Sequence, residues 1–94
     1  MAFKPGRLTV TRGISSEMVV STKFQRFVME SVSRYSAGDW GELSTGDKLA
    51  NDSAVANGDD RILGAYVSKE LQRKIYILTD ADRNFTTVMF PSEY

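Results

Sequence analysis

The sequence predicts an α+β fold with an antiparallel sheet of about four strands and two helices on one face of it, in the order β-α-α-β-β-β. Three observations predict this class. The chain has 94 residues with 41% hydrophobic content, which suits one core and therefore one domain over residues 1–94. Apolar residues recur at helical spacing from Phe24 to Tyr35. Three β-rich runs then follow, separated by short polar segments.

The first predicted element is a strand. Residues 7–12 alternate polar and apolar side chains, and Gly13 interrupts the pattern, as is typical of a half-buried strand. We expect Leu8 and Val10 to face the core. The place of this strand in the sheet stays open, because it can add at an edge or beside a central strand.

A helix is predicted next, from about Lys23 to Tyr35. Its apolar face consists of Phe24, Phe27, Val28, Ser31, Val32 and Tyr35. Thr22, followed three residues later by Gln25, matches a capping box, in which each side chain satisfies a free backbone amide at the helix start.

A second, weaker helix, capped by Ser44 or Thr45, is predicted to run to about Asn57, and Gly58 follows as a left-handed stop. Its apolar stripe is thin, so we expect the helix to pack at the edge of the domain. The glycine-containing loop before it holds Trp40, the only tryptophan. Its side chain is interpreted either as a core plug or as a binding hot spot.

The last third of the chain predicts a meander with strands at 61–67, 74–79 and 84–90. The connections are too short for the crossovers that parallel neighbours need. The turn that starts at Asp80 has the D-x-D-x-N opening of a calcium loop but lacks its glycine and its final glutamate, so we expect a hairpin turn and no metal site. The exposed edge of the meander leaves room for a homodimer by strand pairing.

Composition narrows the chemistry. The chain has no histidine and no cysteine. Ser-His and Cys-His catalysis and ordinary zinc sites are therefore excluded, and we expect no catalytic residues, no cofactor and no enzyme activity. No apolar run approaches the roughly 20 residues of a membrane helix, and no signal sequence is evident at the N-terminus, so a cytoplasmic protein without a membrane partner is expected.

Charge is distributed unevenly along the chain. Residues 1–35 have a net charge of +4, and residues 36–60 carry six carboxylates against Lys48 alone, a net charge of −5. The basic third, with Arg7, Arg12, Lys23, Arg26 and Arg34, permits nucleic-acid binding, although a pI near 6.2 argues against it. The acidic stretch is either a solvated face or a mimic that enters a basic groove on a nucleic-acid-binding protein.

An extended pattern over residues 20–94 resembles small proteins encoded on plasmids, integrative elements and phages, often labelled plasmid-related or restriction-subunit-like. The matching segments are FVM (27–29) with Ser31 and Tyr35, DWGEL (39–43), NDSA (51–54), DRILGAY (60–66), IYILTDADR (75–83) and TTVMFPSEY (86–94). The resemblance implies a mobile-element accessory protein that blocks a host defence system, as an anti-CRISPR or anti-restriction protein.

Together these observations predict a non-enzymatic inhibitor that binds a host nucleic-acid-processing complex, such as a CRISPR effector or restriction enzyme, through an acidic surface. The expected site is Trp40 as an anchor with a rim of Asp39, Glu42, Asp47, Asp52, Asp59 and Asp60. The alternatives are a nucleic-acid-binding regulator that uses the basic third and a small hydrolase with paired carboxylates and a divalent ion.

Overall fold

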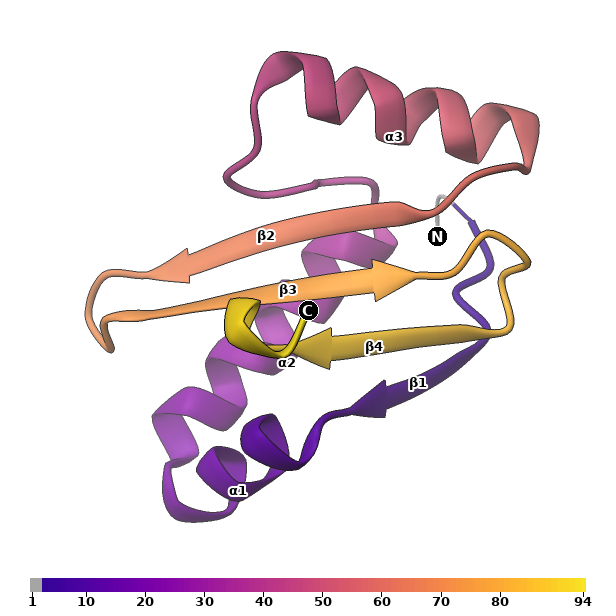
Figure 1. Ribbon diagram of the computed structural model, residues 1–94. Helices are drawn as coiled ribbons and strands as arrows, with labels where there is room; N and C mark the ends of the chain where they lie inside the picture. Colours follow the sequence, from indigo (N-terminus) through magenta and orange to yellow (C-terminus); the bar gives the residue numbers. More distant parts are fainter. Residues whose placement is uncertain (1–2) are drawn as a thin grey trace.

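The last three strands form the meander that the sequence predicts. In the computed structural model, which describes residues 3–94, β2 (Ile62–Ser68), β3 (Arg73–Thr79) and β4 (Phe85–Met89) pair antiparallel in sequence order (Figure 1). Residues 1 and 2, part of the segment in which no signal sequence is expected, lie outside the described residues.

β1 (Arg7–Val10) corrects the prediction of an antiparallel sheet, because it pairs parallel with β4 and makes the sheet mixed, in the order β1-β4-β3-β2. Most of the chain connects β1 to β4, and this connection is long enough for the crossover that parallel neighbours need. β1 is thus an edge strand. Leu8 is 50% exposed and Val10 39%, which shows that the expected core positions were wrong: the helices do not cover this edge.

The sequence reading missed one helix, α1 (Arg12–Val20), which starts directly after β1. The Thr11 side chain caps it by accepting a hydrogen bond from the Ile14 amide. Ile14 is its one fully buried residue, so no apolar stripe marks the helix in the sequence. Gly13 and the β-branched pair Val19 and Val20 also lower its helix propensity.

α2 (Thr22–Ser36) confirms the first predicted helix and lies behind the sheet in Figure 1. Its N-cap is Ser21, which accepts a hydrogen bond from the Phe24 amide, so the capping box expected at Thr22 was wrong. Ser21 also ends α1, and one residue therefore separates the two helices. The face of α2 that carries Phe24, Val28 and Tyr35 is buried against the sheet.

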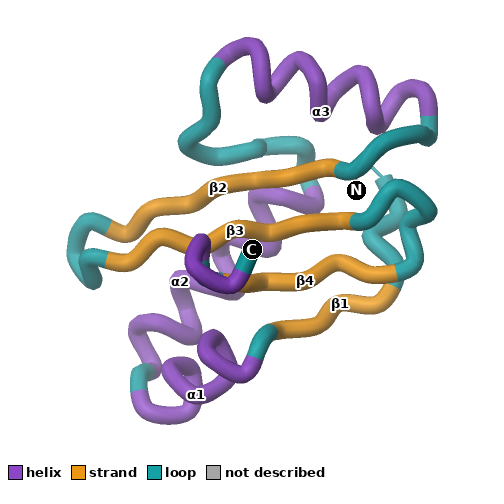
Figure 2. Tube along the Cα trace, viewed as in Figure 1, coloured by secondary structure: helices purple, strands orange, loops and turns teal. Residues whose placement is uncertain are grey.

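α3 (Thr45–Asn57) confirms the second predicted helix, with Ser44 as N-cap and Gly58 at φ 69° as its left-handed stop. It does not share a sheet face with the other helices. It runs along the outer side of β2, beyond the edge of the sheet (Figures 1 and 2). The structure therefore has three helices rather than two, and α3 occupies the domain edge, as its thin apolar stripe predicts.

The core lies between the sheet and the α1/α2 layer. Its largest fully buried side chains include Tyr35, Tyr66, Phe24 and Ile14. The opposite sheet face carries η1 (Pro91–Glu93), and Tyr94 packs edge-on against Tyr76. Among residues 3–94, no helix has the length and apolar character needed to cross a membrane.

Candidate functional site

The acidic segment is built onto the outer edge of β2. The Ala65 amide donates to the Trp40 carbonyl at 3.1 Å, and the Glu42 amide donates to the Ala65 carbonyl at 2.7 Å. Gly41, at φ 78°, lies against the Ala65 carbonyl so closely that a Cβ there would overlap it. The loop therefore acts as a very short extra strand beside β2.

Side chains complete this edge on both sides of Ala65. The Asn51 amide donates to the Leu63 carbonyl at 2.8 Å, and its oxygen accepts from the Leu63 amide at 3.3 Å. The Val67 amide donates to Glu42 Oε2 at 3.1 Å. Since these backbone groups are already bonded, the free meander edge expected from the sequence is occupied, and strand pairing with a second copy is blocked there.

Trp40 is part of the core. Its side chain is 3% exposed, and its ring centroid lies 5.4 Å from that of Tyr35 and 5.9 Å from that of Phe3. The indole Nε1 donates to Asp52 Oδ1 at 2.9 Å. Of the two interpretations of Trp40, the structure matches the core plug. The ring presents almost no surface to a partner, whereas Asp52 itself is exposed.

Asp39 and Glu42 hold the loop to α2. Arg34 Nε and Nη2 donate to the two carboxylate oxygens of Asp39 at 2.7 and 3.2 Å, and Glu42 Oε1 lies 3.9 Å from Arg34 Nη1. The hydrogen bond from Arg34 lowers the pKa of the Asp39 carboxyl below its ordinary value. The Arg34 guanidinium also lies 5.2 Å from the centre of the Tyr66 ring. These two predicted rim residues are therefore engaged within the protein.

Arg83 organises the far end of α3, a role that the sequence reading did not find. Its guanidinium donates to the backbone carbonyls of Ala54, Asp59, Asp60, Asp80 and Ala81 at 2.6–3.2 Å. It thereby ties the β3–β4 turn to the C-terminal end of α3, where cations interact favourably with the helix dipole. In the sequence, only an arginine that follows two aspartates in the turn DADRN (80–84) signals this role.

The D-x-D-x-N segment is a hairpin turn, as predicted. Asp80 Oδ1 accepts hydrogen bonds from the amides of Asn84 and Phe85 at 2.9 and 3.4 Å. Its carboxylate thus faces its own backbone, as in an Asx turn. Within residues 3–94, no three His, Cys, Asp or Glu side chains are grouped so as to hold a metal ion.

Four predicted site residues surround α3 with exposed carboxylates, and we call them the acidic surface. They are Asp47, Asp52, Asp59 and Asp60. Asp47 and Asp60 line a groove of about 340 Å³ between α3 and β2, which Arg61 also lines. Asp60 Oδ1 accepts from the Arg61 amide at 2.8 Å, and its second carboxylate oxygen makes no hydrogen bond in the described part of the chain.

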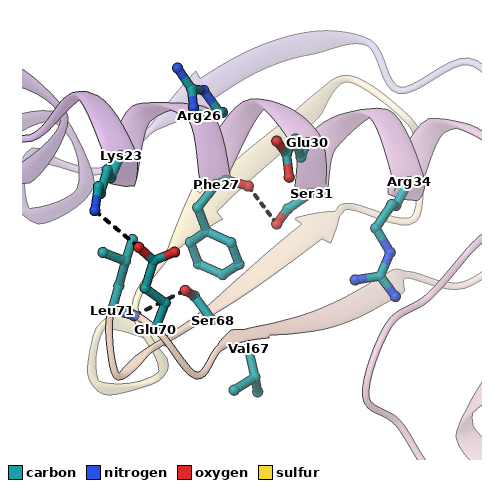
Figure 3. Close-up of a pocket in the computed structure, with 10 residues that line it drawn as sticks. All are labelled: Lys23, Arg26, Phe27, Glu30, Ser31, Arg34, Val67, Ser68, Glu70 and Leu71. Atoms are coloured by element: carbon teal, nitrogen blue, oxygen red, sulfur yellow. Dashed lines mark hydrogen bonds and ion pairs between the residues drawn. The ribbon is translucent and has the colours of Figure 1, made fainter.

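A second groove, of about 370 Å³, lies between α2 and the β2–β3 hairpin (Figure 3). Its walls carry both signs of charge: Lys23 Nζ lies 3.0 Å from Glu70 Oε1, and Arg26 and Glu30 lie along the helix. The ring of Phe27 lies between the helix and the hairpin. The mixed charge gives this groove no clear preference for an anion or a cation.

The basic residues of the N-terminal third do not form one uncompensated face. Lys23 is paired with Glu70, and Arg34 with Asp39. Arg7, Arg12 and Arg26 lie on β1, α1 and α2 respectively. No protein-family model, curated protein or solved structure matches the chain.

Proposed function

We propose that this protein is a non-enzymatic inhibitor that binds a host nucleic-acid-processing complex, a CRISPR effector or a restriction enzyme, through the acidic surface around α3. The observation that carries the proposal is the way α3 is fastened. Asn51 and Arg83 hold it through backbone groups, which leaves Asp47, Asp59 and Asp60 exposed to solvent. Asp52 is also exposed, although one of its carboxylate oxygens accepts the bond from Trp40.

Rigid attachment suits a protein-binding role. A helix that is already held in its bound position loses little conformational entropy on association. α3 is anchored at its middle by Asn51 and by the bond from the buried Trp40 to Asp52, and at its end by Arg83. These contacts support a preorganised surface on a helix whose buried side chains are few.

The charge suggests the kind of partner. Nucleic-acid-processing complexes hold phosphates with surfaces rich in Lys and Arg, and guide–target duplexes lie in positively charged channels. Carboxylates at the same surface compete with phosphate, and opposite charge accelerates encounter at low salt. The resemblance to mobile-element proteins supports a host defence complex as the target. The absence of His and Cys from the sequence supports inhibition by binding rather than by catalysis.

The test is capture of partners from host lysate on the immobilised protein, followed by kinetics with the purified complex. We expect Asp47→Asn/Asp59→Asn to lower the association rate and to reduce its salt dependence. The matched control is Glu30→Gln/Glu70→Gln, which removes two exposed carboxylates on α2 and the β2–β3 hairpin.

Two results would contradict the proposal. One is a capture that recovers no nucleic-acid-processing complex. The other is an equal loss of association rate in both double variants, because net charge alone would then explain it. A gel-shift series over salt addresses the alternative regulator: direct binding to nucleic acid that weakens steeply with salt would favour the basic third instead.

A further inference from the structure

The two edges of the sheet differ in their free backbone groups. The β2 edge is occupied by the 40–42 loop, Asn51 and Glu42, whereas β1 forms the other edge (Figure 2). The Arg7 amide donates to the Asn84 carbonyl at 2.9 Å and the Thr11 amide to the Val88 carbonyl at 3.1 Å. Because alternate residues of a parallel strand bond to one neighbour, the amides and carbonyls of Leu8 and Val10 point away from the sheet.

The side chains of these two residues are also exposed and apolar. Leu8 and Val10 lie opposite Thr86 and Val88, on the helix-facing side of the sheet, but at 50% and 39% exposure they lie beyond its cover. β1 is short, but it contains no proline, and its one charged side chain, Arg7, belongs to the opposite sheet face. The edge is thus open to strand pairing.

We propose that β1 pairs antiparallel with β1 of a second copy of this chain, about a two-fold axis that passes between the two Thr9 residues. In this register Leu8 lies opposite the partner's Val10, and Val10 opposite the partner's Leu8. All the outward amides and carbonyls of both residues are then bonded, the two four-stranded sheets join, and the exposed apolar side chains meet in cross-strand pairs.

Charge complementarity favours the same occupant and the same register. Arg7 lies opposite the partner's Thr11. The Thr11 hydroxyl donates to Glu93 Oε1 at 2.7 Å, so a carboxylate is held beside it. Arg7 and Thr11 share a sheet face by strand alternation, since Thr9 Oγ1 lies 3.0 Å from Thr87 Oγ1 on that face. Arg7 has no ion pair among residues 3–94, and the dimer brings it beside the partner's Glu93.

The competing registers are poorer. A shift by one residue places inward-bonded groups of one strand against outward groups of the other and turns the side chains to opposite faces. A shift that sets Leu8 against the partner's Leu8 leaves Val10 opposite Gly6 and moves Arg7 away from Thr11. The register centred on Thr9 alone combines both apolar pairs with both Arg7–Glu93 contacts.

The chain has no cysteine, so single-cysteine variants test the register directly. The two Thr9 residues form a non-hydrogen-bonded antiparallel pair, with Cα atoms about 4.5 Å apart, within the range of a disulfide. We expect mild oxidation of Thr9→Cys to yield a disulfide dimer. Leu49→Cys, which is exposed on α3 at the opposite edge of the sheet, is the control and should stay monomeric at the same concentration.

Light scattering over a concentration series provides the second readout. We expect a monomer–dimer equilibrium that Leu8→Lys weakens by about tenfold or more, because it places a charge in both apolar pairs. Val67→Lys, on the occupied β2 edge and 40% exposed, should leave the equilibrium unchanged. A wild-type protein that stays monomeric throughout, a dimer insensitive to Leu8→Lys, or equal cross-linking of both cysteine variants would overturn the proposal. None of these results depends on host-complex binding by α3.

Discussion

The side chain of Asn51 pairs with the backbone of Leu63 as a neighbouring strand would. Its Nδ2 donates to the Leu63 carbonyl at 2.8 Å, and its Oδ1 accepts from the Leu63 amide at 3.3 Å. Asn51 is 7% exposed although it lies on a surface helix. One amide therefore both attaches α3 and occupies part of the β2 edge.

We expect Asn51→Ala to lower the free energy of unfolding by about 1–3 kcal/mol, because it leaves the Leu63 amide and carbonyl without partners at a site of low exposure. Denaturant unfolding measures this change. Asn57→Ala, on the exposed last turn of α3, is the matched control. Both substitutions raise helix propensity, so an equal loss in the control would show that the bonds to Leu63 are not its cause.

Arg83 yields a second prediction. Arg83→Ala removes the donors that serve the carbonyls at the end of α3, and we expect a loss of about 1–2 kcal/mol in unfolding free energy, with faster amide hydrogen exchange in the last turn of the helix. Arg83→Lys should recover little, since an ammonium lacks the planar fork that spans several acceptors.

Backbone strain must be separated from this effect. Arg83 has φ 63°, a left-handed conformation that glycine adopts without cost. Arg83→Gly should therefore destabilise less than Arg83→Ala, while exchange at the α3 end stays fast in both. Protection of α3 that is unchanged in every Arg83 variant would contradict the capping role.

Trp40 provides an intrinsic fluorescence probe of folding. Because the indole is 3% exposed and is the only tryptophan, we expect native emission at short wavelength with weak quenching by iodide, and a red shift on unfolding. Trp40→Phe keeps an aromatic ring but loses the hydrogen bond to Asp52, at a cost of about 1–3 kcal/mol. Strong quenching of Trp40 emission in the native protein would place the ring at the surface and favour its interpretation as a binding hot spot.

Alkaline pH should destabilise the protein through two buried tyrosines. Burial raises the pKa values of Tyr35 and Tyr66 above the ordinary 10.0. The pKa of each tyrosine is higher in the folded than in the unfolded state. The contribution of the two neutral hydroxyls to stability is therefore complete below pH 10.0 and is lost as the pH rises further. Denaturant unfolding at several pH values measures the loss, and Tyr35→Phe should reduce its slope. A native phenolate signal from all four tyrosines near pH 10.0 would contradict this prediction.

By itself the sequence determined the elements whose signals are local. The three-four spacing from Phe24 to Tyr35 specifies α2. The two ends of α3 are specified by its cap, Ser44, and by its stop, Gly58. The β-rich runs after Arg61 specify a meander. α1 was not predicted, because it buries chiefly Ile14 and its sequence therefore shows no helical spacing of apolar residues.

The tertiary structure alone decided the parallel pairing of β1 with β4, the exposure of Leu8 beyond the cover of the helices, and which carboxylates of the acidic segment are engaged within the protein. The carboxylates of Asp39 and Glu42 bind Arg34, the Trp40 indole binds Asp52, and Arg83 reaches α3 from a turn 29 residues beyond Ala54. Local propensity records what one segment prefers. Contacts between distant segments decide which edge of the sheet is occupied and which carboxylates stay exposed. Those contacts exist only once the sheet has formed.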